Sequence, residues 1–312
     1  MGSTVPSIDA GVRERLTARF GSEVETWFDE LPGLLTALAD RWQFVLGCSI
    51  PRGSVSVVFW CRMADGRHAV LKASPDRARL ASEAAALDAW HTVHTPAVIA
   101  LDEQLGALLI EAIEPGTPLV VSAAYPSVES IAELLSSLHR NGVPDPSYPT
   151  VARRVRYLFE SSAKLYERHP DLTAAVPPDL YARGRGLASQ LARHDFRMVL
   201  LHADLTPSNI LDGGAARGLV AIDPAPCLGD AAFDAVDMIL WQADDLETID
   251  ARAEQLAAAT GLDAHRLLAW CSAFAGMSAL ELASQGSVPK ARIDALLTLA
   301  SRAQTASETN AP

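Results

Sequence analysis

Lysine is scarce in this sequence. Only Lys72, Lys164 and Lys290 are lysines among 312 residues, although Lys and Arg together number 26. Lys72 is the only lysine before residue 164, and it ends a strand-like apolar run. Because lysine is so rare here, each lysine is a candidate for a specific role, and Lys72 is the first candidate.

Cysteine and long apolar runs are also lacking. The four cysteines, Cys48, Cys61, Cys227 and Cys271, have no metal-ligand spacing and are too few for a disulfide scaffold. No apolar run reaches the roughly 20 residues that span a bilayer, and the N-terminus has neither the basic flank nor the apolar core of a secretory signal. We therefore expect reduced thiols, no membrane partner and a cytoplasmic location.

Basic charge is in deficit, and the formal net charge is −12. Proteins that bind nucleic acid are usually basic, so this balance argues against such a partner. An acidic field would attract a cationic small molecule, but the same charge could serve solubility alone. At 312 residues, 49% of them hydrophobic, the chain can form two globular domains. We expect a monomer or a homodimer.

The most informative stretch runs from Val199 to Pro224. Apolar runs bounded by turn residues predict buried strands there. Asp204 and Asn209 fall in the polar turn after the first run, and Asp223 ends the third. Phosphoryl transfer needs one carboxylate to orient or deprotonate the attacking hydroxyl, and oxygen ligands to hold Mg²⁺ on the nucleotide. The spacing predicts Asp204 as the catalytic carboxylate and Asn209 with Asp223 as the metal ligands.

This stretch resembles the aminoglycoside phosphotransferase family. The resemblance rests on Leu201-His202-Ala203-Asp204, Asn209, Ile222-Asp223-Pro224 and Gly229-Asp230-Ala231-Ala232-Phe233-Asp234. The last two motifs are most similar to the branch of streptomycin 6-kinases and hydroxyurea phosphotransferases. Ala203 departs from the pattern, since relatives often carry Gly or a larger residue there. The alternative is that these polar residues only make a turn, and the correctly spaced Asp223 argues against it.

The resemblance implies an α+β, two-lobed protein-kinase-like fold. A small N-terminal lobe with an antiparallel sheet, residues 1–113, would bind the nucleotide. A mainly helical C-terminal lobe, residues 114–312, would hold the catalytic loop and the acceptor site. The Pro-Gly pair after Glu114 is typical of a linker.

Two helices are expected within residues 9–46, broken at Leu31-Pro32-Gly33, before a first strand at 54–59. The loop 50–54, ending at Ser54, would cover the nucleotide phosphates with backbone N–H groups. Lys72, at the end of the strand 68–73, would pair with the phosphates. Glu83 shares a face of the helix 76–91 with apolar residues, so it needs a buried partner. That partner would be Lys72, unless Glu83 lies at the solvated edge of the helix.

By resemblance, backbone groups near Glu111 and Ile113 would hold adenine. Backbone contacts do not distinguish purines, so ATP is expected as the cofactor, with Mg²⁺, and GTP is not excluded. Further helices are expected at 127–139, 150–168, 178–195, 231–243, 248–260, 263–284 and 288–303.

Several acidic residues follow the catalytic motifs. Asp230, Asp234 and Asp237 would share one face of the helix 231–243, which could bind a cationic substrate. The family implies instead that Asp230 holds the catalytic loop through backbone hydrogen bonds and that Asp234 caps a turn. Asp237 and Glu281, the latter in an apolar run of a C-terminal helix, remain as substrate-binding residues.

The sequence thus predicts an ATP-dependent kinase that phosphorylates a hydroxyl of a streptomycin-like aminoglycoside and so confers antibiotic resistance. One alternative is a kinase of the same fold acting on choline, homoserine or an amino sugar. Another is a nucleotide-binding pseudokinase, which usually lacks a catalytic or metal residue. Lys72, Glu83, Asp204, Asn209 and Asp223 are all present here.

Overall fold

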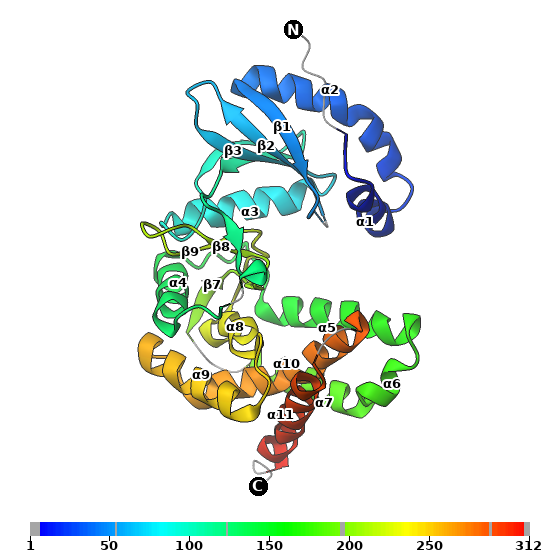
Figure 1. Cartoon of the computed structure of the whole chain (residues 1–312), viewed down its shortest axis with the longest axis vertical. Coiled ribbons are helices and arrows are strands. Elements are labelled where there is room, and N and C mark those ends of the chain that lie inside the picture. Colours follow the sequence, from blue (N-terminus) through cyan, green and yellow to red (C-terminus); the bar gives the residue numbers. More distant parts are fainter. Residues whose placement is uncertain (1–6, 54, 123, 194–196, 287–288, 309–312) are drawn as a thin grey trace. The chain divides into compact units, whose positions relative to one another are not determined.

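The computed structural model describes residues 7–53, 55–122, 124–193, 197–286 and 289–308. It divides the chain into two compact units, Met1–Gly116 and Thr117–Pro312. The first contains an antiparallel sheet and the second is mainly helical (Figure 1).

The N-terminal unit is built on a five-stranded sheet in the order β1-β2-β3-β5-β4, with every neighbouring pair antiparallel. Its elements are α1 (Ala10–Phe20), α2 (Val24–Trp42), β1 (Phe44–Ile50), β2 (Val57–Met63), β3 (His68–Ala73), α3 (Arg77–Trp90), β4 (Val98–Asp102) and β5 (Ala107–Glu111).

The two faces of this sheet have different roles. Alternate strand residues such as Phe59, Leu71 and Leu109 form one core with the buried faces of α1 and α2. Side chains of a strand point to opposite faces in turn. Lys72 therefore points to the other face, where α3 packs on β4 and β5. The alternation separates a purely apolar face from one that carries a buried charge.

The predicted break at Leu31-Pro32-Gly33 is wrong, because α2 continues through Pro32. An internal proline costs a helix about 3 kcal/mol or more. The buried residues on both sides keep helical spacing: Val24, Phe28, Leu31, Leu35 and Leu38. Each such burial is worth about 1.5–3 kcal/mol, so their sum outweighs the proline.

The strand β1 is a second difference from the sequence-based expectation, which placed residues up to 46 in helices. The helix α2 ends at Trp42, where Gln43 adopts a left-handed backbone with φ 55°, and Phe44 then begins a strand that pairs with β2. The short run Phe44-Val45-Leu46 is compatible with either helix or strand by pattern alone. As a result, the loop 50–54 does not precede the first strand but joins the first two.

The C-terminal unit is built of helices around two small antiparallel sheets, β10-β7 and β6-β8-β9. Its elements are β6 (Thr117–Pro118), a 3₁₀ helix η1 (Leu119–Val121), α4 (Val128–Asn141), α5 (Val151–Arg168), α6 (Leu172–Ala175), α7 (Pro178–Leu191), β7 (Met198–Leu201), β8 (Ile210–Asp212), β9 (Leu219–Ala221), β10 (Cys227–Asp230), a 3₁₀ helix η2 (Ala231–Ala235), α8 (Val236–Leu240), α9 (Leu246–Thr260), α10 (Ala264–Gln285) and α11 (Lys290–Glu308).

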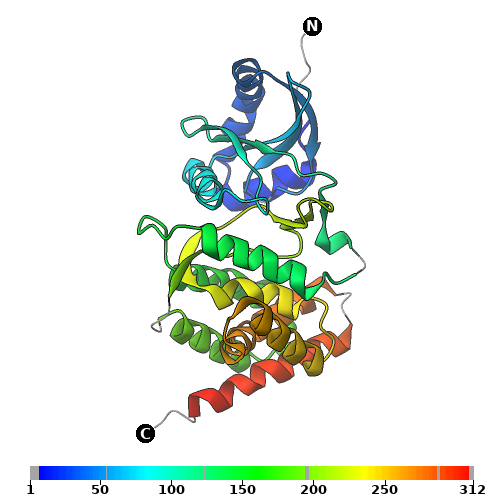
Figure 2. The same cartoon turned by 90° about the vertical axis from the view of Figure 1, so that its left-hand side faces the viewer.

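The helix α10 is the centre of this unit and packs on α5, α7, α9 and α11, while α4 lies beside α9 (Figure 2). Trp270 and Phe274 of α10 pack with Phe233 and Phe159 in a cluster of edge-on and tilted aromatic rings. Among the described residues, α10 alone is long and apolar enough to cross a membrane, but 61% of its apolar window is buried inside the unit. It is therefore a core helix.

The predicted helix 231–243 is wrong in form. The segment starts as the 3₁₀ helix η2 and only then becomes the short α8, which ends at Leu240. The tighter 3₁₀ winding changes the side-chain period. Asp234 is consequently buried, whereas the Asp237 side chain is accessible to solvent. The three aspartates do not act as one acidic face.

Gly229 on β10 is tightly packed against Val151 and Leu201, and its substitution tests this packing. A Cβ atom there would lie 2.6 Å from Val151 Cβ and 2.7 Å from Leu201 Cδ1. We expect Gly229→Ala to lower the free energy of unfolding by about 1–3 kcal/mol, the usual cost of overpacking. Gly186, exposed on α7, is the matched control, because a Cβ atom added there would have no other atom within 4 Å. Gly186→Ala should raise stability by about 0.5–1 kcal/mol. Urea denaturation checks both, and equal effects would contradict the packing argument.

Candidate active site

Lys72 and Glu83, two of the predicted nucleotide-binding residues, form a buried ion pair in the N-terminal unit. Lys72 Nζ lies 2.5 Å from Glu83 Oε1, and each residue is 4% exposed. Lys72 stands on β3 between Val58 and Leu108 of the neighbouring strands, and Glu83 comes from the inner face of α3. Burying two charges is costly unless they pair, so the pair fixes α3 against the sheet. The structure brings together the two residues that the sequence analysis joined.

The loop between β1 and β2 is fastened to α1. Arg15 donates from Nε to the Gly53 carbonyl and from Nη2 to the Pro51 carbonyl, each at 3.0 Å. Gly53 cannot be replaced without movement, since a Cβ there would lie 1.8 Å from the Ser56 carbonyl oxygen. Ser54, predicted as part of the phosphate-covering loop, lies outside the described residues.

The predicted adenine-binding segment follows β5. The Glu111 N–H donates to the Ala97 carbonyl at 2.9 Å, and the Glu111 carboxylate accepts from the Ala97 N–H at 3.1 Å. Ile113 is buried, with 4% of its surface exposed. The N–H of Glu111 is thus engaged within the unit, and adenine binding by this segment stays a prediction.

In the C-terminal unit, Asp204 is held from both sides of its carboxylate. Arg154 Nη2, from α5, donates to Oδ1 at 2.9 Å. Asn209 Nδ2 donates to Oδ2 at 3.2 Å and to the Asp204 carbonyl at 3.0 Å. About 28% of the Asp204 side chain remains exposed. This is the geometry of an oriented carboxylate that a substrate hydroxyl can still approach.

Asp223 comes next to Asn209 through strand pairing. Ile210 of β8 lies opposite Ala221 of β9, and the Ile222 N–H donates to the Asn209 carbonyl at 2.9 Å. Asn209 directly precedes β8 and Asp223 closely follows β9, so the antiparallel register makes them neighbours. Asp223 has a left-handed backbone, φ 57°, which is rare for a residue other than Gly and is enriched at functional sites.

These two side chains fit a magnesium site. The side-chain Nδ2 of Asn209 donates to Asp204, so the side-chain oxygen of the same amide, Oδ1, points away from Asp204. Together, Asn209 Oδ1 and the Asp223 carboxylate supply the hard oxygen ligands that Mg²⁺ prefers. No cluster of three or more His, Cys, Asp or Glu side chains occurs in the described part of the chain. Mg²⁺ on a nucleotide takes only one or two protein carboxylates, so such a cluster is not required.

Asp234 holds the first residues of the candidate catalytic loop, residues 202–209, through hydrogen bonds. Its carboxylate accepts from the N–H groups of His202, at 3.0 Å, and Ala203, at 2.8 Å, and lies 3.0 Å from His139 Nε2. His202 is fully buried, and this burial lowers its pKa against the opposing effect of Asp234 and the other nearby carboxylates. It is therefore a neutral structural residue.

The roles expected for Asp230 and Asp234 are wrong, because the two are interchanged. Asp230 accepts from the Ala232 N–H and from Trp270 Nε1 at 2.6 Å, pairs with Arg266, and caps η2. The register of β10 with β7 explains this. Asp230 lies opposite Met198, while Cys227 lies opposite Leu201, next to the catalytic loop. The tight winding of η2 then brings Asp234, not Asp230, to the loop.

Asp237 and Glu281 line one pocket of about 150 Å³, together with Pro207 of the catalytic loop, Leu240, Trp241, Gln242, Ser278, Leu282, Gln285, Arg292 and Leu296. Both acids are reached by solvent, but the surrounding protein atoms displace much of their hydration. That desolvation, followed by repulsion from Asp237 and Asp204, raises the pKa of Glu281 to about 7. Desolvation and repulsion from Asp204 raise the pKa of Asp237 to about 6. Two neighbouring acids with raised pKa values therefore share this pocket with one arginine, Arg292.

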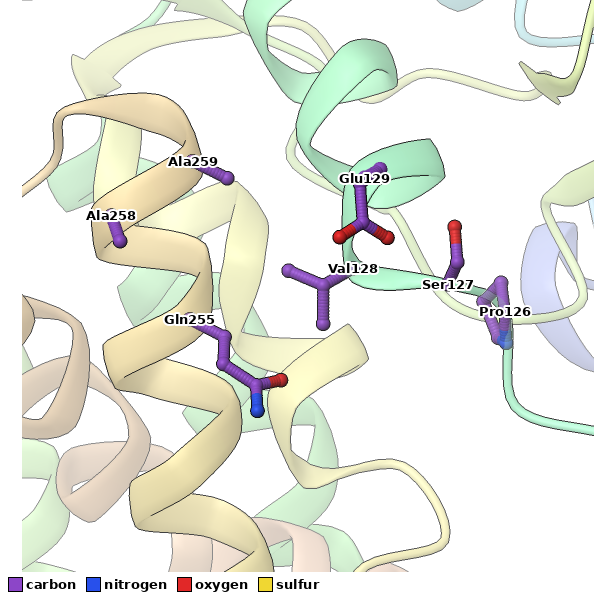
Figure 3. A pocket seen from close by; sticks show the side chains of 7 residues that line it. All are labelled: Pro126, Ser127, Val128, Glu129, Gln255, Ala258 and Ala259. Atoms are coloured by element: carbon purple, nitrogen blue, oxygen red, sulfur yellow. The ribbon is translucent and has the colours of Figure 1, made fainter.

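A larger open groove lies between the start of α4 and α9, where Val128 and Gln255 face each other (Figure 3). Its volume is about 740 Å³, and Glu129 is the one carboxylate in its described lining. Small and apolar side chains make up most of the rest. The pocket of Asp237 and Glu281 therefore has two carboxylates in its lining, where this groove has one.

Arg154 and the loop-holding role of Asp234 escaped the sequence analysis. Arg154 lies 50 residues before Asp204 on a different element, and it belongs to a helix with several arginines. No local motif distinguishes it from its neighbours. Only the packing of α5 against β10 identifies the arginine that faces the catalytic loop.

Two solved structures similar to this one have the kinase-like fold. A choline kinase from Streptococcus pneumoniae matches with a TM-score of 0.59 at 13% identity, over 91% of this chain and all of that one. A spectinomycin phosphotransferase, solved with ADP and spectinomycin, matches with a TM-score of 0.56 at 12% identity, over 87% and 98% of the two chains. These similarities confirm the predicted α+β, two-lobed protein-kinase-like fold. At identities of 12–13% they bear on the fold alone.

Sequence comparison gives the family. The family model of the aminoglycoside/hydroxyurea antibiotic resistance kinases matches residues 41–286, and the chain belongs to this family of phosphotransferases. Streptomycin 6-kinases of Streptomyces griseus and Streptomyces glaucescens are each 29% identical to it. The first alignment covers 75% of this chain and 73% of the relative, and the second covers 80% and 82%. The family expected from the motifs is confirmed.

The Lys72–Glu83 pair leads to a stability prediction. Lys72→Met or Glu83→Gln alone disrupts a buried charge pair and should cost about 3–5 kcal/mol. The double variant should cost much less than the sum. Urea denaturation, with hydrogen exchange of β3 and α3 to locate the effect, measures this. Lys164→Met, at an exposed position on α5, is the control and should change stability by no more than about 0.5 kcal/mol. Additive losses would show that the two charges do not depend on each other.

Proposed function

We propose that this phosphotransferase moves the γ-phosphate of ATP to a hydroxyl of a streptomycin-like aminoglycoside and thereby inactivates the antibiotic. The observation that carries the proposal is the acidic pocket of Asp237 and Glu281, which is lined by Pro207 of the same loop that holds Asp204. The similarity to two streptomycin 6-kinases supports it. ATP as the donor is consistent with a cytoplasmic site of action.

Asp204 is assigned the role of orienting or deprotonating the acceptor hydroxyl. Its carboxylate is held by Arg154 and Asn209 and remains partly exposed. A general base must lie within hydrogen-bonding reach of the hydroxyl it activates. An acceptor cation in the pocket of Asp237 and Glu281 would bring its hydroxyl toward this carboxylate, because Asp204 is close enough to raise the pKa of both acids.

Nucleotide-binding roles are assigned to residues of each unit separately. Lys72, oriented by Glu83, would neutralise charge on the phosphates, and the backbone of the β1–β2 loop would cover them. Asn209 and Asp223 would hold Mg²⁺, which when bound offsets the negative charge of the phosphates. Glu111 and Ile113 would contact the adenine through backbone groups.

The acceptor is assigned from charge and shape. The guanidinium and ammonium groups of an aminoglycoside would pair with the carboxylates of Asp237 and Glu281, and the indole of Trp241 offers a flat wall of the kind that attracts cations. The net charge of −12 would add long-range attraction. A small quaternary amine would use fewer of these contacts.

An acceptor panel tests the proposal. Streptomycin, a kanamycin-type compound, hydroxyurea, choline and homoserine are each incubated with Mg²⁺ and ATP, and ADP release and product mass are measured. We expect robust transfer to streptomycin, and bacteria that express the enzyme should tolerate it. Transfer to choline or homoserine, with none to any aminoglycoside, would contradict this proposal and identify the protein as a metabolite kinase. Nucleotide binding without transfer to any acceptor would favour a pseudokinase.

Asp204→Asn gives the first kinetic prediction. A positioned acid–base group contributes about 10²- to 10⁴-fold to the rate, so kcat should fall by a factor in that range. The Kd for Mg·ATP, measured by calorimetry, should change little, because Asp204 serves the acceptor. Asp212→Asn, at an exposed carboxylate on β8, is the control and should retain normal turnover. Wild-type kcat in Asp204→Asn would remove this residue from its role.

The pocket acids predict a pH dependence. An acid is charged above its pKa, so Asp237 and Glu281 gain charge as pH rises through about 6 and about 7. The acceptor KM should therefore fall between pH 5.5 and 8, by about one to two decades for a charge-assisted contact.

Glu281→Gln should remove the upper part of that pH dependence and raise the acceptor KM more than the ATP KM. Glu254→Gln, on an exposed face of α9, is the matched control and should leave the profile unchanged. An acceptor KM that does not vary over this pH range would place the cation elsewhere.

A further inference from the structure

Arg154 contacts two consecutive residues of the catalytic loop. Its Nε donates to the Ala203 carbonyl and its Nη2 donates to Asp204 Oδ1, both at 2.9 Å. The side chain is 11% exposed and also lies over the ring of Tyr157, with Cζ 5.6 Å from its centroid. The guanidinium therefore joins α5 to the backbone and to the side chain of the loop at once.

We propose that Arg154 is a positioning residue of the phosphotransfer reaction, which sets the orientation of the Asp204 carboxylate toward the acceptor hydroxyl. This inference rests on the role proposed above for Asp204. It assigns to a residue of α5, outside every motif of the sequence, a part in setting the turnover number.

The shape of the guanidinium explains why the residue is an arginine. Its planar fork presents N–H donors in fixed directions, so one donor can reach a carbonyl while another reaches the carboxylate of the next residue. A lysine ammonium is a point charge and can supply the attraction but not the paired geometry. A Lys in this position should therefore recover only part of the effect.

The contacts of Arg154 complete a clamp on the loop. Asn209 holds the other carboxylate oxygen, Oδ2, at 3.2 Å, so rotation of the Asp204 side chain would break a bond on either side. Ala203 has a left-handed backbone, φ 59°, which is unfavourable for an L-residue other than Gly. Its N–H is held by Asp234 and its carbonyl by Arg154. Removal of Arg154 frees the carbonyl side of this strained residue next to the reacting carboxylate.

The test compares Arg154→Met and Arg154→Lys with Arg156→Met, since Arg156 is exposed on the same helix. We measure kcat, both KM values and the melting temperature of the full chain. Misplacement of a reacting group by about 1 Å lowers the reaction rate by roughly 10²-fold. We expect kcat of Arg154→Met to fall by about that factor with the ATP KM within about twofold, a smaller loss in Arg154→Lys, and no change in Arg156→Met.

Two further measurements separate positioning from general stability. Guanidinium ion at millimolar concentration should restore part of the turnover of Arg154→Ala, whereas ethylammonium at equal ionic strength should not. Arg154→Met added to Asp204→Asn should cause little further loss of kcat, because the two residues act as one unit.

The outcomes are distinct. Unchanged kcat in Arg154→Met, or a loss of kcat that follows the melting temperature and is not rescued by guanidinium, would overturn the inference. So would a lower acceptor KM with unchanged kcat, which would make Arg154 a competitor of the substrate cation. If Asp204→Asn itself kept normal turnover, the proposed function would fail first. Loss in Asp204→Asn without loss in Arg154→Met would overturn only the role of Arg154.

Discussion

The buried carboxylate of Asp234 is the interaction on which the catalytic loop depends. An isolated carboxylate inside a protein is strongly unfavourable, so its acceptor sites must be filled. Here the N–H groups of His202 and Ala203 fill them, with His139 as a further partner. The backbone groups at the tightest part of the loop are thereby satisfied without any neighbouring strand. The positions of Asp204, Asn209 and Asp223 follow from that fixed turn and from the pairing of β8 with β9.

The acids of the C-terminal unit divide into two classes by the partners they have. Asp230 and Asp234 are buried with strong donors and serve structure. Asp237 and Glu281 are desolvated beside another acid, and their pKa values are raised. An acid with a raised pKa in the folded state costs stability as pH rises above its unfolded pKa and through its folded one. The protein tolerates this cost near neutral pH at a pocket where a cation would relieve it, which is typical of a binding site rather than of a core.

Local sequence predicted the parts of the fold whose contacts are local. The step from Asp204 to Asn209, the strand that ends near Asp223, and the common face of Glu83 with Leu80 and Leu87 are each visible within a few residues. Asp237 and Glu281 were selected by type and position, and the structure places them in one pocket. Their chemical roles, like those of Lys72 and Asn209, remain predictions.

The failures have the opposite character, because each depends on a partner far along the chain. Pro32 stays helical because both ends of α2 are held on the sheet by buried residues. Asp230 and Asp234 exchange roles because the register of β10 with β7 sets the distance back to the loop. Arg154 is distinguishable from Arg153 and Arg156 only by the side of α5 that packs on β10. The motif therefore names the candidate catalytic groups, while contacts from residues without a motif orient them. Since a reaction of this kind depends on positioned charge more than on covalent steps, sequence motifs alone describe the site incompletely.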